Sequence, residues 1–410
     1  AAVAVNNIKK ETNAYAKKNA KLDAKGQISL NAKNTEDLTN WSVQGSGGAM
    51  AGLAGAVHVT NLTTITKAYT DTVVAINQKD RAKGTYGGHI SINAAHEIKR
   101  MKNAVAGAAI SGTASIGAAV DVVNVKTQTN AFLGDGNTVD TQGDVSITAQ
   151  DHMQGIESYT YGASIGSFGL SGSVSVYNFG STMSEEGKEA LTGTDKNGKG
   201  FDDWVNDMLN QSQTGSAMDV YSSEALANVK GKLGETFASE APSTTGEQGT
   251  LAKIGNGTTI NAGGNVSVKA DDTLDVKNTM GNLSGSLTAS AGASVSVVNT
   301  DTQTKALIDK AAKIASQGNL NVNARSTHTM TNVITGASAA FTGVAGQGTV
   351  QTWKDHSDVY ALIGDTQGVS AKNISVTAKN DRTLNSTLVG ASVALYGALN
   401  GAVITADVSG

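Results

Sequence analysis

The side chains best suited to acid–base chemistry in this sequence are two aspartates within expected β-strands, Asp121 and Asp144. Enzymes that cleave polysaccharides on parallel β-strand scaffolds need two positioned carboxylates, one as acid and one as base. Neither aspartate has an acidic residue at the matching place one repeat later in the chain. Most other Asp and Glu residues lie in expected turns or in residues 184–249. We therefore expect no catalytic site, and we expect that the chain is not an enzyme.

Histidines and one acidic loop could instead bind a metal ion. The histidines are His58, His89, His96, His152, His328 and His356, and they occupy different repeat positions without the spacing of a zinc site. Residues 195–206 begin like a calcium loop, but Lys199 and Asn206 stand where such a loop needs acidic ligands. We expect the histidines to be exposed polar side chains on the wall of the molecule, and we expect no metal ion or other cofactor.

The composition argues against ordinary compact domains and against several classes of partner. The 410 residues include 48 glycines, one proline and no cysteine, and only 4% are aromatic. Small and β-branched residues suit thin, stacked β layers better than a thick aromatic core. The net charge is −4 with both signs interspersed, so no nucleic-acid partner is expected. No long apolar run of the kind that spans a membrane occurs, so no membrane insertion by this segment is expected.

A repeat of about 54 residues organises the sequence. Its first signature is a run of small residues, then alternating valines, then an asparagine. The asparagines that close it are Asn7, Asn61, Asn124, Asn178 and Asn299. With two degenerate copies included, the intervals are 54, 63, 54, 121, 55 and 53 positions. We expect these asparagines to bond to the backbone at turns, and because they lie a whole repeat apart they need not form a ladder from one to the next.

A second signature has the same period. It begins with a glycine and a polar residue and continues as an alternating strand that closes on alanine. The glycines are Gly26, Gly88, Gly143, Gly264 and Gly318. Two independent signatures with one period indicate an internal repeat. The longest interval predicts a large insertion between Asn178 and Val266, and the second longest predicts a few extra residues near 71–86.

Alternation with period 2 inside each repeat predicts β-strands with one buried face. Gly, Asn and Asp between the strands predict turns, where a positive φ is often needed. A β-solenoid fits best, because small residues fill its interior and proline, which cannot join the backbone ladder, is almost absent. The expected fold is an elongated, all-β solenoid of the right-handed parallel β-helix type. Each repeat would hold either two coils or three, and the sequence leaves both open.

Residues 184–249 have a different character and are expected to form a small α-helical insertion. Their apolar residues follow helical spacing, and a face for partner binding would contain Phe201, Trp204, Val205, Met208, Leu226 and Phe237. The expected organisation is solenoid repeats in residues 1–183, the insertion in 184–249 and further solenoid repeats in 250–410. The first residues look like the middle of a repeat, so we expect the chain to be a piece of a longer one.

The two signatures, as in residues 55–61 and 262–270, resemble those of leukotoxin-like and filamentous-hemagglutinin-like adhesins, the giant exoproteins of Gram-negative bacteria. The resemblance covers the whole chain except the insertion. It implies an extracellular protein, secreted or at the bacterial cell surface and outer membrane, that binds a protein or glycan receptor on host cells or other bacteria.

The function expected from this resemblance is that of the structural stalk and interaction region of a filamentous adhesin. Flanking repeats of the same polypeptide would be its other partners. A segment of a leukotoxin-like cytotoxin, or a polysaccharide-degrading β-helix, is the alternative.

Overall fold

The computed structural model describes residues 2–78, 87–180 and 249–409. Within these residues every strand pairing is parallel and no helix occurs. For these residues the expectation of β-structure with parallel strands is confirmed. The expected helical insertion lies outside the described residues except for Gly249, which begins a strand.

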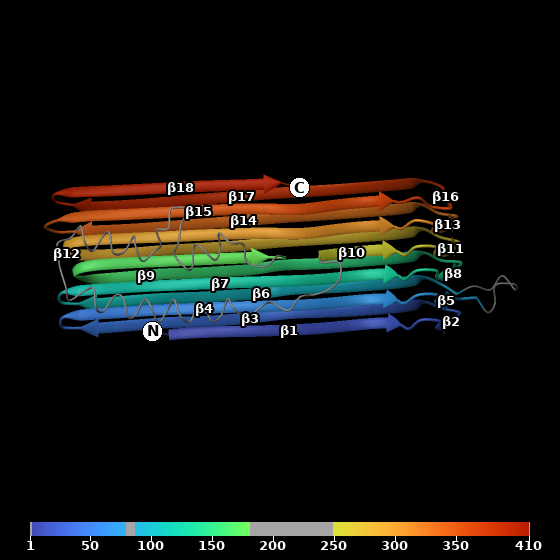
Figure 1. Ribbon diagram of the computed structural model, residues 1–410, viewed down its shortest axis with the longest axis horizontal. Helices are drawn as coiled ribbons and strands as arrows, with labels where there is room; N and C mark the ends of the chain where they lie inside the picture. The colour runs from blue at the N-terminus through green and yellow to red at the C-terminus, as the bar shows by residue number, and fades with distance from the viewer. Residues whose placement is uncertain (1, 79–86, 181–248, 410) are drawn as a thin grey trace.

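Two broad walls and a narrow end sheet make up the described structure (Figure 1). The first wall contains β1 (Ala2–Ala16), β4 (Ala51–Thr70), β7 (Ala114–Leu133), β10 (Gly249–Ile254), β15 (Val344–Ile363) and β18 (Gly397–Ser409). The second wall contains β3 (Ile28–Gly48), β6 (Ile90–Ser111), β14 (Leu320–Ala340) and β17 (Ile374–Ala394). Two longer strands, β9 (Val145–Phe179) and β12 (Val266–Ile308), run through both walls. The end sheet contains β2 (Lys21–Leu22), β5 (Ala75–Ile76), β8 (Thr138–Thr141), β11 (Thr259–Ala262), β13 (Lys313–Ser316) and β16 (Gly368–Ser370).

Each strand pairs with strands one repeat away. Val3 of β1 pairs with Val57 of β4, and Val266 of β12 pairs with Leu320 of β14, so the partners stand at equivalent positions of successive repeats. One circuit through the first wall, the end sheet and the second wall therefore takes a whole repeat. The alternatives of two coils and of three coils per repeat are both wrong. Each repeat forms one coil, because its long strands, such as β4 with 20 residues, take up most of its length.

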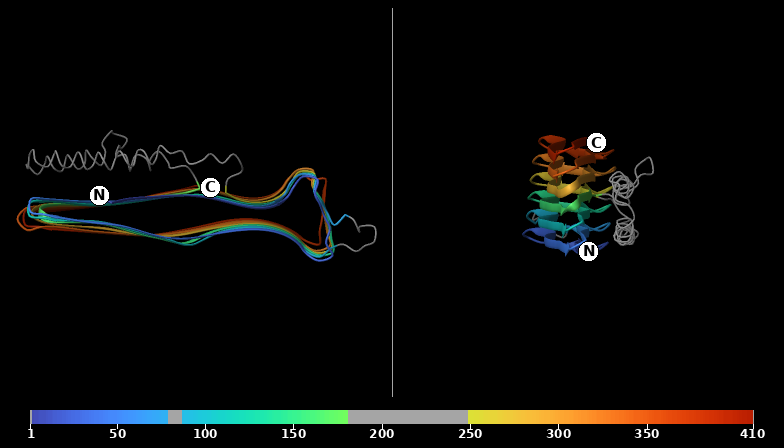
Figure 2. Two further views of the ribbon diagram at one scale, coloured as in Figure 1. Left: turned by 90° about the horizontal axis from the view of Figure 1, so that it is seen from below. Right: turned by 90° about the vertical axis from the view of Figure 1, so that its left-hand side faces the viewer.

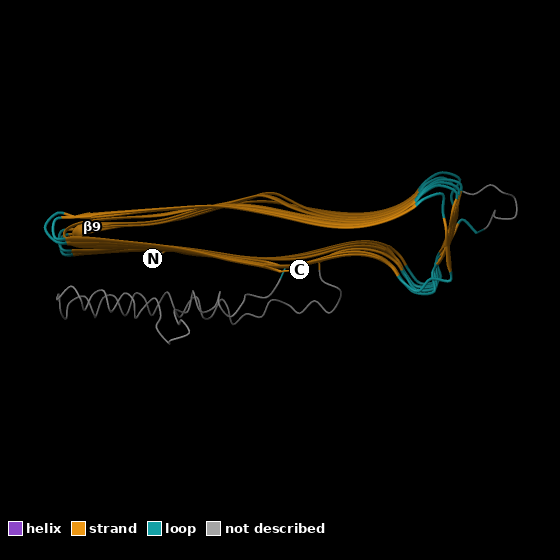
Figure 3. Cartoon of the chain, turned by 90° about the horizontal axis from the view of Figure 1, so that it is seen from above, coloured by secondary structure: helices purple, strands orange, loops and turns teal. Residues whose placement is uncertain are grey.

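We call the strands of one circuit a layer. The layers stack so that the two ends of the chain lie at opposite ends of the stack (Figure 2). Seen along the stack, the two walls are long strands, joined by loops at one end and by loops and the short strands of the end sheet at the other (Figure 3).

Residues 181–248 interrupt a single strand of the first wall. On β7, Val125 pairs with Phe179 at the end of β9, and Gln128 pairs with Gly249 at the start of β10. Gly180 and Gly249 have φ values of 82° and 86°, in the region that favours glycine. The chain thus leaves the wall and rejoins the same strand three register positions further on, where the longest repeat interval predicts an insertion.

The other predicted interruption lies between two elements of the same layer, β5 and β6. Lys21 pairs with Ala75 of β5, whereas Ile28 pairs with Ile90 of β6. The two partners in β5 and β6 are thus further apart in the chain than Lys21 and Ile28 are. The extra residues therefore enter at the end sheet, within the predicted range 71–86.

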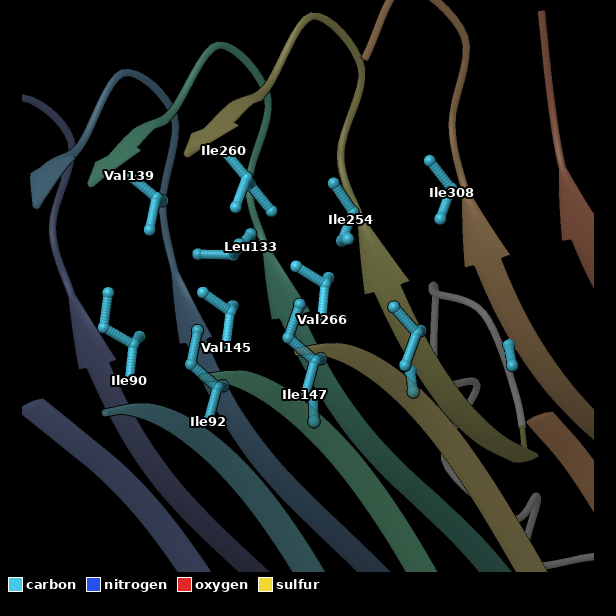
Figure 4. Packing of buried hydrophobic residues seen from close by; sticks show 14 of the residues in the cluster. Ile90, Ile92, Leu133, Val139, Val145, Ile147, Ile254, Ile260, Val266 and Ile308 are labelled. Carbon is cyan, nitrogen blue, oxygen red and sulfur yellow. The ribbon is translucent and has the colours of Figure 1, made fainter. Parts of the chain in front are cut away.

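Equivalent repeat positions form columns of side chains along the stack. The second signature supplies the columns nearest the end sheet, where Ile90, Val145 and Val266 are register partners and Ile92 pairs with Ile147 (Figure 4). All five are at most 1% exposed. Burial of each such side chain stabilises the fold by about 1.5–3 kcal/mol. A second apolar cluster, which includes Leu62, Met101, Met153, Tyr177 and Trp353, lies further along the strands.

The turn that leaves the first wall has a left-handed residue at the equivalent position in successive layers. These residues are Asn19, Val73, Gly136, Gly257 and Ala311, with φ between 55° and 66°. The sequence prediction of Gly or Asn at such a turn is confirmed in three of these five layers. Val73 and Ala311 adopt the same φ because the layers on either side fix the turn.

Candidate functional site

The five asparagines of the first signature form a ladder along the first wall. Asn61 donates to Asn7, Asn124 to Asn61 and Asn178 to Asn124, each at 2.7 Å, and Asn299 donates to Asn178 at 2.9 Å. The expectation that these asparagines lie at turns is therefore wrong, since they lie within strands, where they bond to one another. One layer per repeat places equivalent residues about 4.8 Å apart, within reach of an amide that both donates and accepts.

The five glycines of the second signature lie where the chain enters the second wall. None is among the described residues with positive φ, so their role differs from the expected turn role. A Cβ on Gly318 would lie 2.6 Å from Oδ1 of Asn265, and one on Gly264 would overlap the carboxylate of Asp144. At Gly264 and Gly318 the preceding layer therefore leaves no room for a side chain, whereas a Cβ on Gly26 would meet nothing within 4 Å.

A polar seam crosses the interior beside the second apolar cluster. It consists of the first-wall column His58, Asp121, Ser175, Ser296 and Gln351 and the second-wall column Asn40, Asn103, Ser158, Asn278, Asn332 and Ser386. Asn278 and Asn332 both donate to Ser296, at 3.0 and 2.8 Å, and Gln351 donates to Ser386 at 2.7 Å. The amide donors of these buried side chains thus find acceptors within the seam.

Asp121 is the most heavily hydrogen-bonded member of the polar seam, and its side chain is 0% exposed. Its Oδ1 lies 2.8 Å from Nδ1 of His58. Its Oδ2 accepts from the hydroxyls of Ser158 at 2.6 Å and Tyr177 at 3.0 Å, and Asn103 donates to both oxygens at 3.2 and 3.3 Å. Burial, and then the charge of Asp121, raise the pKa of Tyr177 well above its ordinary value, so this phenol is a neutral donor.

The protonation of His58 follows from its two neighbours. Its Nε2 lies 3.2 Å from Nδ2 of Asn6 and 3.3 Å from the hydroxyl of Thr60. An amide nitrogen only donates, so Nε2 accepts and the proton lies on Nδ1, facing Asp121. The second hydrogen of the Asn6 amide goes to Oδ1 of Asn40 at 2.8 Å. His58 is therefore a neutral ring with both nitrogens engaged.

A second buried histidine, His328, lies between two carboxylates. Its Nε2 is 2.8 Å from Asp272 and its Nδ1 is 3.0 Å from Asp355. Carboxylates only accept, so both nitrogens carry protons and His328 is an imidazolium. Nε of Arg382 lies 2.8 Å from Asp355, which gives two positive and two negative groups. We call these four residues the His328 cluster.

The pKa shifts in the His328 cluster follow from the same contacts. Burial alone would lower the pKa of His328, but hydrogen bonds to Asp272 and Asp355 outweigh it and raise that pKa above its ordinary value. Burial pushes the pKa of Asp355 upward, but the bonds from His328 and Ser357 and the charge of Arg382 lower it overall. Burial lowers the pKa of Arg382. The cluster is thus charged at neutral pH.

The expectation of exposed histidines is wrong for three of the six. His58, His96 and His328 are each 1% exposed, and His96 pairs with Asp151 at 2.7 Å. The side chains of His89, His356 and His152 are 63%, 57% and 36% exposed, as expected. Side chains alternate between the two faces of a strand, and the three buried histidines fall on the inward face.

The buried set of Asp121, His58, Tyr177 and Ser158 contains side-chain types that perform acid–base catalysis, but it is closed to substrate. Each of the four is at most 1% exposed, and Asn6 occupies Nε2 of His58. The other strand aspartate singled out from the sequence, Asp144, lies apart from this set beside the exposed His89, at 3.2 Å.

The remaining predicted sites are placed as follows. The six apolar residues of the insertion lie outside the described residues, so partner binding by them stays a prediction. Within the described ranges, no three His, Asp or Glu side chains are positioned to hold a metal ion. In those same ranges no helix is long and apolar enough to cross a membrane. A groove at the end sheet is lined by hydroxyl and amide side chains, among them Thr141, Asn261 and Gln317.

No protein-family model, curated protein or solved structure matches this chain.

The polar seam and the His328 cluster are the parts of the interior that sequence reasoning missed. Their signal lies at positions 40, 103, 158, 278, 332 and 386, which are all Asn or Ser and follow the repeat intervals. Aligning the repeats on these positions, as well as on valine and glycine, would have revealed the second-wall side of the seam.

Proposed function

We propose that the chain is the rigid, non-catalytic scaffold and interaction region of a secreted or surface-exposed filamentous adhesin, built as a parallel β-solenoid whose coil is one repeat. The observation that carries the proposal is the register, because equivalent residues pair from the first described repeat to the last. Repeats that contact only their neighbours can be added or removed without designing a new core.

Each layer is much longer along its strands than it is high along the stack, so stacked layers form a broad wall. A 20-residue strand such as β4 spans about 66 Å at about 3.3 Å per residue, while each layer adds only about 4.8 Å to the stack. Each added repeat therefore contributes little length and much stiff, wide surface. We propose that the walls present the surface that attaches to host cells or other bacteria, through a protein or glycan receptor.

The closed interior supports a non-catalytic role. The charged groups of the His328 cluster and the seam neutralise or hydrogen-bond one another, and their burial keeps substrates out. Incubation with acidic and neutral polysaccharides should therefore give no turnover. Turnover that survives purification and disappears in Asp121→Asn would contradict this part of the proposal.

Deleting one whole layer tests the architecture. Removing residues 266–319, one complete repeat, places Leu320 where Val266 pairs with Val145. We expect this variant to keep its β circular dichroism and a cooperative melt. Removing only residues 266–292, half a repeat, shifts every later strand out of register and should prevent folding. If the half-repeat deletion folds as well as the whole-repeat deletion, the proposed coil is wrong.

Cell binding tests the adhesive role. We expect the full chain, coupled to fluorescent beads, to bind host cells or bacteria saturably and in competition with the free chain. Removing residues 182–248 restores the ordinary repeat spacing and should leave a folded protein. Loss of binding in this variant would place adhesion in the insertion, and unchanged binding would place it on the walls. A folded full chain that binds no cell type tested would overturn the adhesive role.

A further inference from the structure

The outer face of the second wall is uncharged over the half furthest from the end sheet. This face consists of alternate residues in segments 41–47, 104–110, 159–165, 279–285, 333–339 and 387–393, four positions in each of six strands. None of these 24 positions holds Asp, Glu, Lys, Arg, His, Asn or Gln. We call this region the uncharged face.

The uncharged face is open to solvent. Trp41 is 71% exposed, Val43 62%, Ile110 59% and Val393 70%. Along the same strands, buried residues such as Val105 and Ser164 alternate with these positions, so the exposed set points away from the interior. Contiguous apolar surface of this kind marks an interaction site on a soluble protein.

The size of the uncharged face matches one half of a stable dimer interface. Four positions at about 6.7 Å spacing and six layers at about 4.8 Å give about 27 Å by about 29 Å, or about 800 Å². A standard protein–protein interface buries about 800 Å² on each partner, and a lone monomer seldom exposes an apolar patch this large.

The relief of the uncharged face is self-complementary. In β9 the large side chains of Tyr159 and Tyr161 form a ridge, and their register partners in β6, Ala104 and Ala106, are both alanine. A two-fold axis would place the ridge of one molecule over the alanines of the other, as sheets that pack face to face interdigitate.

The charges that border the uncharged face do not suit an anionic lipid surface. Lys102 lies 3.8 Å from Glu157, and its ammonium is 5.1 Å from the ring of Tyr159. Membrane surfaces attract clusters of unpaired Lys and Arg. We propose that a second copy of this chain packs face to face on the uncharged face, so that the protein self-associates side by side. This contact is separate from receptor binding and does not depend on the adhesive role.

Charge introduced into the uncharged face tests the proposal on the full chain. Ala106→Lys places a charge inside the face, and Asn93→Lys places one on the same strand outside it. Sedimentation over a range of concentrations should show a dimer for the unaltered chain. Ala106→Lys should raise its dissociation constant at least about tenfold, while Asn93→Lys should change it less than about twofold. Circular dichroism should show the same β content in all three proteins.

Cysteine cross-linking supplies a second readout, because the chain has no cysteine of its own. Ala163 lies near the centre of the uncharged face, so Ala163→Cys should form a disulfide-linked dimer on mild oxidation and Asn93→Cys should not. A chain that stays monomeric at all concentrations, or that dimerises equally well with Ala106→Lys, overturns the proposal. Binding to phosphatidylcholine vesicles by a chain that is monomeric in solution would assign the face to lipid instead and would also overturn it.

Discussion

The two buried histidines show how the same interior holds a neutral ring in one place and a charged ring in another. His58 faces one carboxylate, Asp121, and an amide that donates to its other nitrogen. His328 faces a carboxylate on each side, Asp272 and Asp355. Both are 1% exposed. Burial therefore does not decide the charge of a histidine here, and the partners on its two nitrogens do.

The two sites should also differ in how much stability is lost when the carboxylate beside the histidine is removed. Around Asp121 the surrounding groups are neutral donors, so its loss leaves unpaired hydrogen bonds. Around Asp355 the partners His328 and Arg382 are cations, so its loss leaves unpaired charge. Unpaired buried charge is the more destabilising of the two.

Asp355→Ala should have the largest effect. Removing this carboxylate leaves the buried His328 and the partly buried Arg382 with one fewer anion, and breaking a buried ion pair destabilises a protein by about 3–5 kcal/mol. Chemical denaturation of the purified variant would measure the loss. As a control, Asp37→Ala removes an exposed ion pair with Arg100 and should leave the denaturation midpoint almost unchanged. Equal effects of the two substitutions would contradict the charge assignment of the cluster.

Asp121→Asn should destabilise less than Asp355→Ala. The new amide nitrogen would face donors, and a buried donor left unsatisfied costs about 1–3 kcal/mol. Ser175→Ala, one layer away in the same column, is the control and should cost about 1 kcal/mol or less. Should Asp121→Asn prove the more damaging of the two aspartate variants, the contrast between neutral and charged sites would be wrong.

The largest pH dependence of stability should come from the buried His328, because His152, whose pKa is also raised by its hydrogen bond with Asp271, has a side chain that is 36% exposed. The pKa of His328 is raised, so its contribution is complete below its ordinary value of about 6.5 and is lost as pH rises through the higher folded value. The pKa of Asp355 is lowered, so its contribution is present above about 3.9 and is lost as pH falls through the lower folded value. The cluster should therefore stabilise most between about pH 4 and pH 6.5.

Paired histidine variants measure this dependence. Each unit by which the pKa of His328 is raised corresponds to about 1.4 kcal/mol lost on the alkaline side. His328→Gln should lack that alkaline loss, and His58→Gln should keep it, when denaturation is followed from pH 5 to pH 9. An alkaline loss of equal size in His328→Gln would assign it to another group.

The repeat, its strands and the place of the insertion could be predicted from the sequence. The direction of the side chains within one layer could not. The valine and glycine signatures predict the repeat, the strands and the place of the insertion, because register follows repeat spacing. The direction of side chains near Val57 and His58 is ambiguous in the sequence, because Ala56 on one face and Val57 on the other are both apolar. For that reason the inward face, and with it His58 and the polar seam, could not be assigned.

The number of coils per repeat could not be predicted from the sequence either. A Gly or Asn in a long repeat is consistent with a turn, and it is equally consistent with a position inside a long strand. Gly107 and Gly117 lie inside strands, where a Cβ would overlap the carbonyl oxygens of Ala118 and Ala163 on the facing wall. Close approach of the two walls, and not a turn, accounts for these glycines.

Asn6→Asp should change stability least and should convert one site into the other. A carboxylate at this position would face Nε2 of His58 while Asp121 still faces Nδ1, as Asp272 and Asp355 face His328. We expect His58 to become an imidazolium, with a change in unfolding free energy within about 1 kcal/mol, because one new ion pair near the end of the stack offsets the two hydrogen bonds that the Asn6 amide donates to His58 and Asn40. Asn6→Ala is the control and should leave the ring neutral.

The nitrogen NMR spectrum of the histidine rings at pH 7 tests most directly the central claim that the interior is closed and that its partners set its charges. In the unaltered chain, His58 should show one protonated nitrogen, Nδ1, and His328 should show two, with assignments made from the His58→Gln and His328→Gln variants. Two rings in the same state, or a His58 whose Nε2 carries the proton, would contradict the account.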